Sequence, residues 1–257
     1  MNGAFYVGAI GLDAQQRALD TIANNISNVN TPAFKRSTVR FSEMMALVPD
    51  GDVVRPDLGA SLSSASGVTS SAIAMIDQQG KIASTGNPFD VAVQGRGFIE
   101  LAGPAGQTLL WRGGTLKVNE DGLLATEQGL PLKAGITIPA DVTAIEISSD
   151  GTVKGVSGQE TGAIELGQIS LVKVDDAAAL ERLDGGLYAA GESVKVADAA
   201  AGEDGVGTFV QGAREQSNVE LSTEMVQLLL VQRAFAANAQ IVQAADQLMA
   251  LANGLRR

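Results

Sequence analysis

Apolar residues recur at helical spacing near the start of the chain. Between about residues 3 and 29 they stand seven, three, four and three positions apart, which is typical of one face of a helix. This N-terminal seam consists of Leu12, Leu19, Ile22, Ile26 and Val29, with Gln15 in its gap. Asparagines and then Pro32 follow. Because proline cannot continue the helical hydrogen-bond ladder, the pattern predicts a helix that ends before Pro32.

The C-terminal segment, from Leu221 to Leu255, carries two apolar seams. Because neighbouring members of the two seams are two residues apart, a rotation of about 200°, the seams lie on nearly opposite sides of a helix. The first seam consists of Leu228, Val231, Phe235, Val242, Ala245 and Met249, and is broken only at Asn238. The second seam consists of Leu230, Ala234, Ala237, Ile241, Ala244, Leu248, Leu251 and Leu255, and is unbroken.

Two interpretations account for a helix with two apolar sides. It is either the buried central helix of a globular domain or a terminal helix that packs on its own N-terminal partner and on neighbouring subunits. Its place at the end of the chain favours the second interpretation, because terminal segments usually lie at the surface. Glutamines, asparagines and two charged residues recur along it, so we expect no insertion into a membrane.

Between the ends, the pattern changes to short β-type runs bounded by turns. Runs such as 91–93, 98–101, 108–111, 116–118, 136–138, 144–147 and 169–174 predict strands. Asp121-Gly122 and Asp150-Gly151 are hairpin signals, whereas residues 47–71 predict loop or extended linker. Many short strands without intervening helices are typical of an antiparallel sandwich or irregular barrel.

The sequence therefore predicts an α+β fold, with a helix at each end and an antiparallel all-β middle domain. We expect four segments: an N-terminal helix with its turn at 1–40, an extended linker at 41–80, the β-rich middle at 81–212 and the C-terminal helix at 213–257.

Composition excludes several classes of function. The 257 residues include no His and no Cys, which rules out a Ser-His-Asp or Cys-His centre, a zinc finger and a disulfide framework. The net charge of −11, from 29 acidic and 18 basic residues, argues against a nucleic-acid partner. The first residues do not resemble a cleavable signal peptide, so the residues alone favour the cytoplasm unless another export route operates.

Candidate chemical motifs are weak. Gly95-Arg96-Gly97 lacks the third glycine of a dinucleotide loop, and a bulge explains it better. Acidic pairs lie in predicted turns without the spacing of a calcium loop, and Trp111 and Tyr188 are typical of a core. We expect no catalytic, cofactor or metal site, and hence no enzyme.

Several longer motifs are specific. They are GLDAQQ at 11–16, IANNISNVNTPAFKR at 22–36, GNPFDVAVQGRGF at 86–98, SNVE at 217–220 and VQRAFAANA at 231–239. Together they resemble the bacterial flagellar basal-body rod and hook proteins. The signature positions are Asn24, Asn25, Asn28, Thr31, Pro32, Phe34, Lys35, Arg36, Ser217, Asn218, Val219, Gln232 and Arg233.

The resemblance implies a structural subunit of the flagellar rod, with the distal rod favoured over the proximal rod. It implies terminal helices that pair as a coiled coil and pack into a torque-transmitting helical tube, with the β domain outside. The implied partners are copies of itself, other rod and hook subunits and the type III export apparatus, which would deliver the chain to the periplasm-spanning rod without a cleaved signal. The expected packing residues are Leu12, Leu19, Ile22, Ile26, Val29, Leu228, Leu230, Val231, Phe235, Ile241, Val242, Leu248, Met249 and Leu251.

Two departures and two rival functions stay open. Ala33 stands where the family commonly has glycine, and residues 41–80 match the family poorly. The rivals are a secreted ligand-binding β domain with helical dimerisation arms, and an export chaperone built as a helical hairpin.

Overall fold

The computed structural model describes residues 2–45, 65–104, 107–157, 163–191, 194–203 and 205–254. It is mostly β, with one long helix near each end of the chain, so the fold is α+β. The chain divides into two compact units. The helical unit comprises Met1–Ser27, Ser37–Ala74 and Glu220–Arg257, and the β unit comprises Asn28–Arg36 and Met75–Val219.

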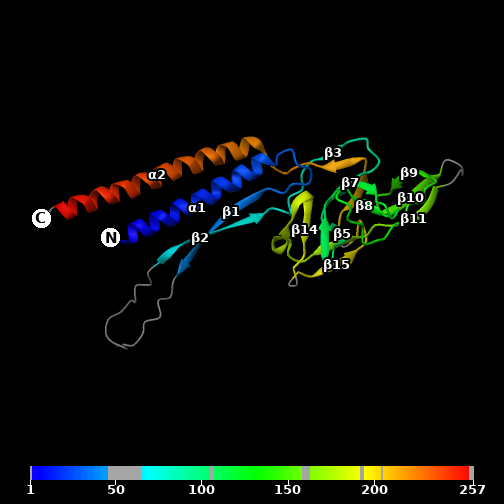
Figure 1. Cartoon of the computed structure of the whole chain (residues 1–257), viewed down its shortest axis with the longest axis horizontal. Helices are drawn as coiled ribbons and strands as arrows, with labels where there is room; N and C mark the ends of the chain where they lie inside the picture. The colour runs from blue at the N-terminus through cyan, green and yellow to red at the C-terminus, as the bar shows by residue number, and fades with distance from the viewer. Residues whose placement is uncertain are drawn as a thin grey trace, which may run out of the picture. The chain divides into compact units, whose positions relative to one another are not determined.

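The helical unit is built on two helices that lie side by side and run in opposite directions (Figure 1). α1 spans Asn2–Ser27 and α2 spans Leu221–Gly254. Beside them, β1 (Ser37–Met45) pairs antiparallel with β2 (Ala65–Ala74), starting with Ser37 opposite Ala74. Residues 65–71, predicted as loop or linker, thus belong to β2, whose backbone pairs with β1. The remainder of that predicted loop, up to residue 64, lies outside the described residues.

Small side chains form the most buried stripe of α1. Ala14, Ala18 and Ile22 are buried, whereas Leu12, Leu19 and Ile26 of the predicted seam are half-buried. Close approach explains the difference: an added Cβ on Gly8 would lie 2.7 Å from Cγ2 of Val242 on α2. Where two helices come this close, small residues face the partner and larger ones flank the contact.

The end of α1 corrects one predicted position. The helix stops at Ser27, so Val29 lies in the following turn and is not part of the helical seam. The turn-forming asparagines around Val29 account for the early stop, since their side chains compete for backbone hydrogen bonds. The backbone N–H of Thr31 then donates to the carbonyl of Asn28.

The described residues of the β unit form four sheets, and their strand pairs are antiparallel. Their strands are β3 (Ile82–Ser84), β4 (Asp90–Gln94), β5 (Phe98–Ala102), β6 (Thr108–Trp111), β7 (Gly113–Val118), β8 (Leu124–Thr126), β9 (Val142–Ile147), β10 (Thr152–Ser157), β11 (Ala163–Gln168), β12 (Leu171–Val174), β13 (Glu181–Arg182), β14 (Leu187–Ala189), β15 (Val196–Ala199), β16 (Thr208–Gln211) and β17 (Ala213–Glu215). The strand orders are β13-β14-β6-β5-β12-β15, β16-β4-β7-β8, β11-β10-β9 and β17-β3. Short 3-10 turns lie at Ala177–Ala179 and Asp184–Gly186.

Most predicted β runs became strands, with one exception. Residues 136–138 form only an isolated bridge, between Leu123 and Thr137. Gly135 has a φ of 59°, which is outside the extended region, and Pro139 has no N–H to donate. The three residues between them are therefore too few to form a β-ladder with a neighbouring strand. Ile136 nevertheless packs in the core with the other buried side chains.

One core joins the three larger sheets. It contains Val91, Ile99, Leu101, Trp111, Leu124, Ile147, Val153, Leu171 and Phe209. The Tyr188 ring meets the Phe98 ring edge-on, with centroids 5.6 Å apart, and burial raises the pKa of the Tyr188 hydroxyl to about 12. Trp111 and Tyr188 are therefore core residues, as the sequence pattern indicates.

Two glycines with similar backbone angles make a matched test of this packing. Gly151, at the β9–β10 turn, has a φ of 90°, and an added Cβ would lie 2.2 Å from the Ile169 carbonyl oxygen. We expect Gly151→Ala to lower the free energy of unfolding by more than about 3 kcal/mol, from the backbone clash and the left-handed conformation together. Gly129 has a φ of 88° but no atom within 4 Å of an added Cβ, so Gly129→Ala should cost about 1–2 kcal/mol. Urea unfolding of both variants measures the difference, and equal losses would contradict this account of the packing.

Candidate functional site

The two seams of α2 have different surroundings. Leu228, Val231, Phe235 and Val242 of the first seam are half-buried on the side that faces α1. The described part of the second seam is exposed, with Leu230 58% and Ile241 59% accessible. Ala234, Ala237 and Ala244 of the second seam are exposed as well. Ala245, Leu248, Met249 and Leu251 are helical positions whose side chains, like Leu255, lie outside the described residues.

The exposed side of α2 is wider than the second seam alone. Val226 and Leu229 are 57% and 55% exposed, and Met225 adds to the same apolar surface. By length and composition, Leu221–Ala244 would suffice to cross a membrane, although helices in the cores of soluble proteins pass the same test. Gln232 and Arg233, two signature positions, are also exposed here, which suits a protein partner better than lipid.

Buried polar side chains link α1, α2 and the start of β1. Asn25 of α1 is 1% exposed and Glu224 of α2 is fully buried. The Asn25 side-chain amide donates to Glu224 Oε2 at 3.2 Å and to the Ser37 carbonyl at 2.8 Å. The Ser37 backbone N–H returns a 2.9 Å bond to Asn25 Oδ1. A signature asparagine thus joins three elements of the helical unit.

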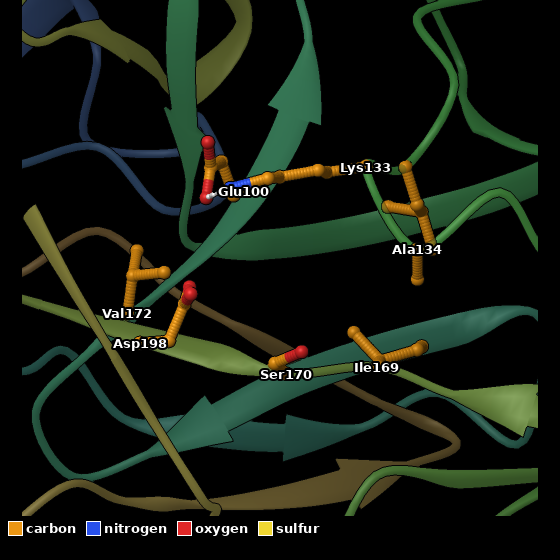
Figure 2. A pocket seen from close by; sticks show the side chains of 8 residues that line it. Glu100, Lys133, Ala134, Ile169, Ser170, Val172 and Asp198 are labelled. Carbon is orange, nitrogen blue, oxygen red and sulfur yellow. Dashed lines mark hydrogen bonds and ion pairs between the residues drawn. The ribbon is translucent and has the colours of Figure 1, made fainter.

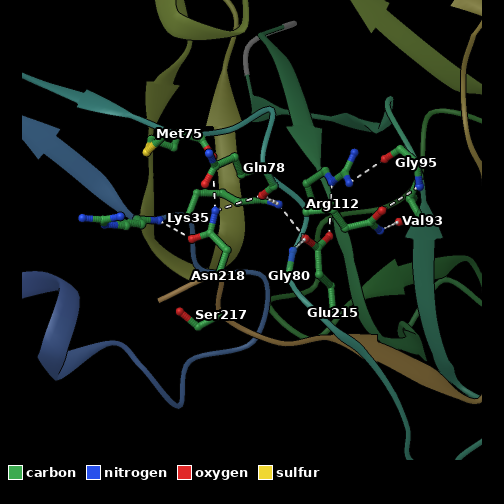
Figure 3. Close-up of polar contacts among 12 residues, drawn as sticks. Lys35, Met75, Gln78, Gly80, Val93, Gly95, Arg112, Glu215, Ser217 and Asn218 are labelled. Carbon is green, nitrogen blue, oxygen red and sulfur yellow. Dashed lines mark hydrogen bonds and ion pairs between the residues drawn. The ribbon is translucent and has the colours of Figure 1, made fainter. Parts of the chain in front are cut away.

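A second buried cluster lies in the β unit (Figure 3). Lys35 Nζ donates to Glu215 Oε1 at 2.5 Å and to the Gln78 carbonyl at 2.8 Å. Glu215 Oε2 faces Arg112 Nε at 3.4 Å, and the backbone N–H of Gly80 donates to Oε1. The Nη2 and Nη1 groups of Arg112 donate to the carbonyls of Gly95 and Gly97, at 2.7 and 2.6 Å. We call Lys35, Glu215 and Arg112 the charge cluster.

Burial sets the electrostatics of the charge cluster. Desolvation lowers the pKa of Lys35 below its ordinary value of 10.5, although the adjacent Glu215 carboxylate acts in the opposite direction. One carboxylate serves two cations, so Glu215 cannot be removed without leaving two buried positive charges together. A second buried carboxylate, Asp90, pairs with Arg214 at 2.9 Å. Burial alone would raise the pKa of Asp90, but hydrogen bonds from Thr85, Arg214 and Thr115 outweigh it and lower that pKa.

Other signature residues hold the segments around the charge cluster. Asn218 Oδ1 accepts from the Arg36 backbone N–H at 2.6 Å, and its Nδ2 donates to the carbonyls of Met75 and Gln78. Arg182 lies 3.8 Å above the buried Phe34 ring. Val219 is buried, and the Ser217 hydroxyl accepts from its backbone N–H. Asn24, Thr31 and Pro32 are exposed and Asn28 is half-buried, with its Oδ1 accepting from the Thr31 hydroxyl.

Ala33 adopts a left-handed backbone conformation. Its φ is 55°, in the left-handed region where glycine is favoured, and its backbone N–H donates to the Glu215 carbonyl. The turn that a glycine would form is therefore kept here by a non-glycine residue, at the cost of backbone strain.

Sequence reasoning missed Glu215, Arg112 and Glu224. A buried lysine requires a carboxylate partner, but only the structure shows that Lys35 is buried. Nothing in the spacing shows which carboxylate, since Glu215 is 180 residues away.

The hollows of the β unit give little support to a ligand site. One, of about 200 Å³, is lined by Glu100, Lys133, Ser170 and Asp198 among others (Figure 2). It is smaller than typical ligand pockets of roughly 300–1,000 Å³, and Lys133 already pairs with Glu100 at 2.7 Å. A hollow of about 400 Å³ reaches Arg112, whose guanidinium already donates to the carbonyls of Gly97 and Gly95. No group of three or more metal-ligating side chains occurs in the described part of the chain.

Comparisons with known proteins match nearly the whole chain. Residues 5–35 match the family described as "Flagella basal body rod protein", residues 92–155 "Flagellar hook protein FlgE/F/G D1 domain", and residues 210–255 "Flagellar basal body rod FlgEFG protein C-terminal". The "Flagellar basal-body rod protein FlgG" of Borreliella burgdorferi is 33% identical over 100% of both chains. The protein of the same name from Caulobacter vibrioides is 32% identical, over 98% of this chain and 99% of its own. A "Flagellar basal-body rod protein FlgF" of Mesorhizobium japonicum is 30% identical, over 95% and 93%.

The charge cluster makes a direct prediction. Glu215→Gln keeps the shape of the side chain but leaves Lys35 and Arg112 without their shared counter-charge. We expect it to lower the free energy of unfolding of the β unit by about 3–5 kcal/mol. Glu100→Gln, which removes the more exposed pair with Lys133, should cost less than about 1 kcal/mol. Equal denaturation midpoints for Glu215→Gln and the parent protein would contradict the role given to the cluster.

Proposed function

The chain belongs to the bacterial flagellar basal-body rod family, and we propose that it builds the distal rod by polymerising through its terminal helices. It is a structural subunit of the rod. The observation that carries the mechanism is the second seam of α2, which is apolar and unbroken in the sequence and exposed at its described positions from Leu230 to Ala244. Exposed apolar surfaces of this extent mark sites of protein contact.

Neighbouring copies would cover that seam. Each fully buried Leu or Ile side chain contributes about 1.5–3 kcal/mol, so Leu230 and Ile241 alone would supply a substantial share of a contact. The second seam differs from the surface that α1 covers, which favours a heterologous, head-to-tail contact. Such contacts extend into helical filaments when the rotation does not close a ring. This is the geometry that a tube requires.

We further infer that α1 and α2 pair as a coiled coil. Their antiparallel course and the regular three-four spacing of the first seam support this pairing. Small residues such as Ala14 and Ala18 allow close approach, and close-packed helices resist bending. A stiff helix pair in each subunit would transmit torque along the rod.

The distal position is supported by the names of the relatives and by length. Several relatives named FlgG align over nearly their full length, as those of Caulobacter vibrioides and Borreliella burgdorferi do. The alternative, a proximal rod protein of the same family, has support from the FlgF relative of Mesorhizobium japonicum. Other rod and hook subunits would be the neighbours above and below.

Delivery through the flagellar type III export apparatus completes the proposal. This route needs no cleaved signal and would place the chain in the rod where it crosses the periplasm. A chain without cysteines cannot form unwanted disulfides in that oxidising compartment. We propose no catalytic activity, no cofactor, no bound nucleic acid and no membrane insertion.

A charge on the second seam tests the proposal. Ile241→Asp adds a carboxylate to the surface that neighbours would bury, and we expect it to abolish swimming and rod growth. Because Ile241 is 59% exposed, the substitution should leave the β unit and the helical content of the isolated protein unchanged. Ile241→Leu is the matched control and should retain motility. Normal swimming by Ile241→Asp cells would overturn the proposal.

A further inference from the structure

The described structure leaves open what aligns α1 with α2 along their length. The residues between them, 28 to 220, form no short turn. Bonds from Ala33 and Arg36 to Glu215 and Asn218 restrain the connecting segments, but they involve no residue of either helix. Apolar seams with a three-four repeat tolerate a slip of one heptad, about 10 Å, because the same kinds of residues meet again. The buried methyl groups of Ala14 and Ala18 can pack against any apolar residue of α2, so they do not select one alignment.

We propose that Asn25 and Glu224 set the axial register of α1 against α2. Glu224 lies on the same stripe of α2 as the first seam, four residues before Leu228, and is the carboxylate in that stripe. It is fully buried, and the Asn25 amide donates to it. A buried polar pair of this kind is satisfied in one alignment only.

If α1 and α2 slipped by one heptad, Asn25 and Glu224 would no longer contact each other. The contact of Gly11 with Asn238 lies fourteen residues from that of Asn25 with Glu224 on each helix (11 to 25, and 224 to 238), which defines the native register. A slip of seven residues one way places Glu224 beside Ala18, where a buried carboxylate has no donor from that side chain. The opposite slip places Asn25 beside Val231. Both alternatives carry the penalty of a buried polar group with a missing partner.

The register decides what the outer surface of the helix pair presents. A slip keeps the second seam outward but moves Leu230 and Ile241 by two helical turns relative to α1. A neighbouring copy that contacts both helices would then meet a different surface. The pair Asn25–Glu224 would thus specify the assembly surface without touching the neighbour.

Cross-linking within one molecule reads the register directly, because the chain has no native cysteine. An added Cβ on Gly11 would lie 3.1 Å from Asn238 Nδ2, so Gly11→Cys with Asn238→Cys reports the native alignment. Gly11→Cys with Val231→Cys reports a slip of one heptad, and Gly11→Cys with Ala245→Cys reports the opposite slip. Each pair is placed in the full-length parent and in two variants, Glu224→Leu and Glu224→Gln, and oxidised as a dilute monomer.

The expected result is a change of partner in one variant only. Glu224→Leu removes the carboxylate and completes an apolar stripe, so the ratio of native to slipped disulfide should fall about tenfold or more. Glu224→Gln keeps an acceptor for the Asn25 amide and should retain the native cross-link. Far-UV circular dichroism checks that both variants keep the helical content of the parent.

Three results would overturn the inference. Glu224→Leu that forms only the native disulfide would show that side-chain shape sets the register. Glu224→Leu that loses its helices would show that the pair stabilises the helices and does not select their alignment. A parent chain that forms none of the three disulfides would show that the helices do not pair in this way within one molecule. Because the cross-links form within one chain, the inference can fail while the proposed rod function stands.

Discussion

One helix with two apolar sides governs the behaviour of this chain. α1 covers the first seam of α2, where small residues allow the two helices to approach closely. No element of the described chain covers the second seam, where Leu230 and Ile241 are more than half exposed. Because exposed apolar area of this extent is costly in water, the helical unit reaches a low free energy only when another surface covers that side. Polymerisation through this seam, as proposed above, is the expected consequence.

Several signature residues are buried and hold segments of the molecule together. Within the β unit, Lys35 and Asn218 join segments that are distant from each other in sequence. Within the helical unit, Asn25 joins α1 to α2 and β1. Burying charge is a poor way to gain stability, because desolvation offsets most of the attraction. It does penalise any arrangement in which a charge loses its partner. Within each unit, the buried polar groups therefore favour one path of the chain over alternatives that separate them.

The sequence predicted the elements better than their contacts. The two terminal helices, the β middle and the hairpins at Gly122 and Gly151 follow from local patterns, which depend on residues close together in the chain. The sequence pattern did not predict the most buried stripe of α1. The most hydrophobic residues, Leu12 and Leu19, were expected in the contact, whereas the close approach of the helices buries Ala14 and Ala18. The charge cluster could not be predicted because its members lie far apart in the sequence, Glu215 being 180 residues from Lys35 and 103 from Arg112. The signature pointed to Lys35 and Asn25 by resemblance, and only the structure identified Glu215 and Glu224 as their partners.

The most direct test asks whether assembly buries the second seam. Ile241→Cys introduces a single thiol into a chain that has none, so labelling with a maleimide reports that position alone. The account predicts rapid labelling in the purified monomer and strong protection in isolated basal bodies, provided that the variant still assembles rods. Leu228→Cys, on the half-buried first seam, should react slowly in both. Labelling of Ile241→Cys that is as fast in the assembled rod as in the monomer would contradict the account.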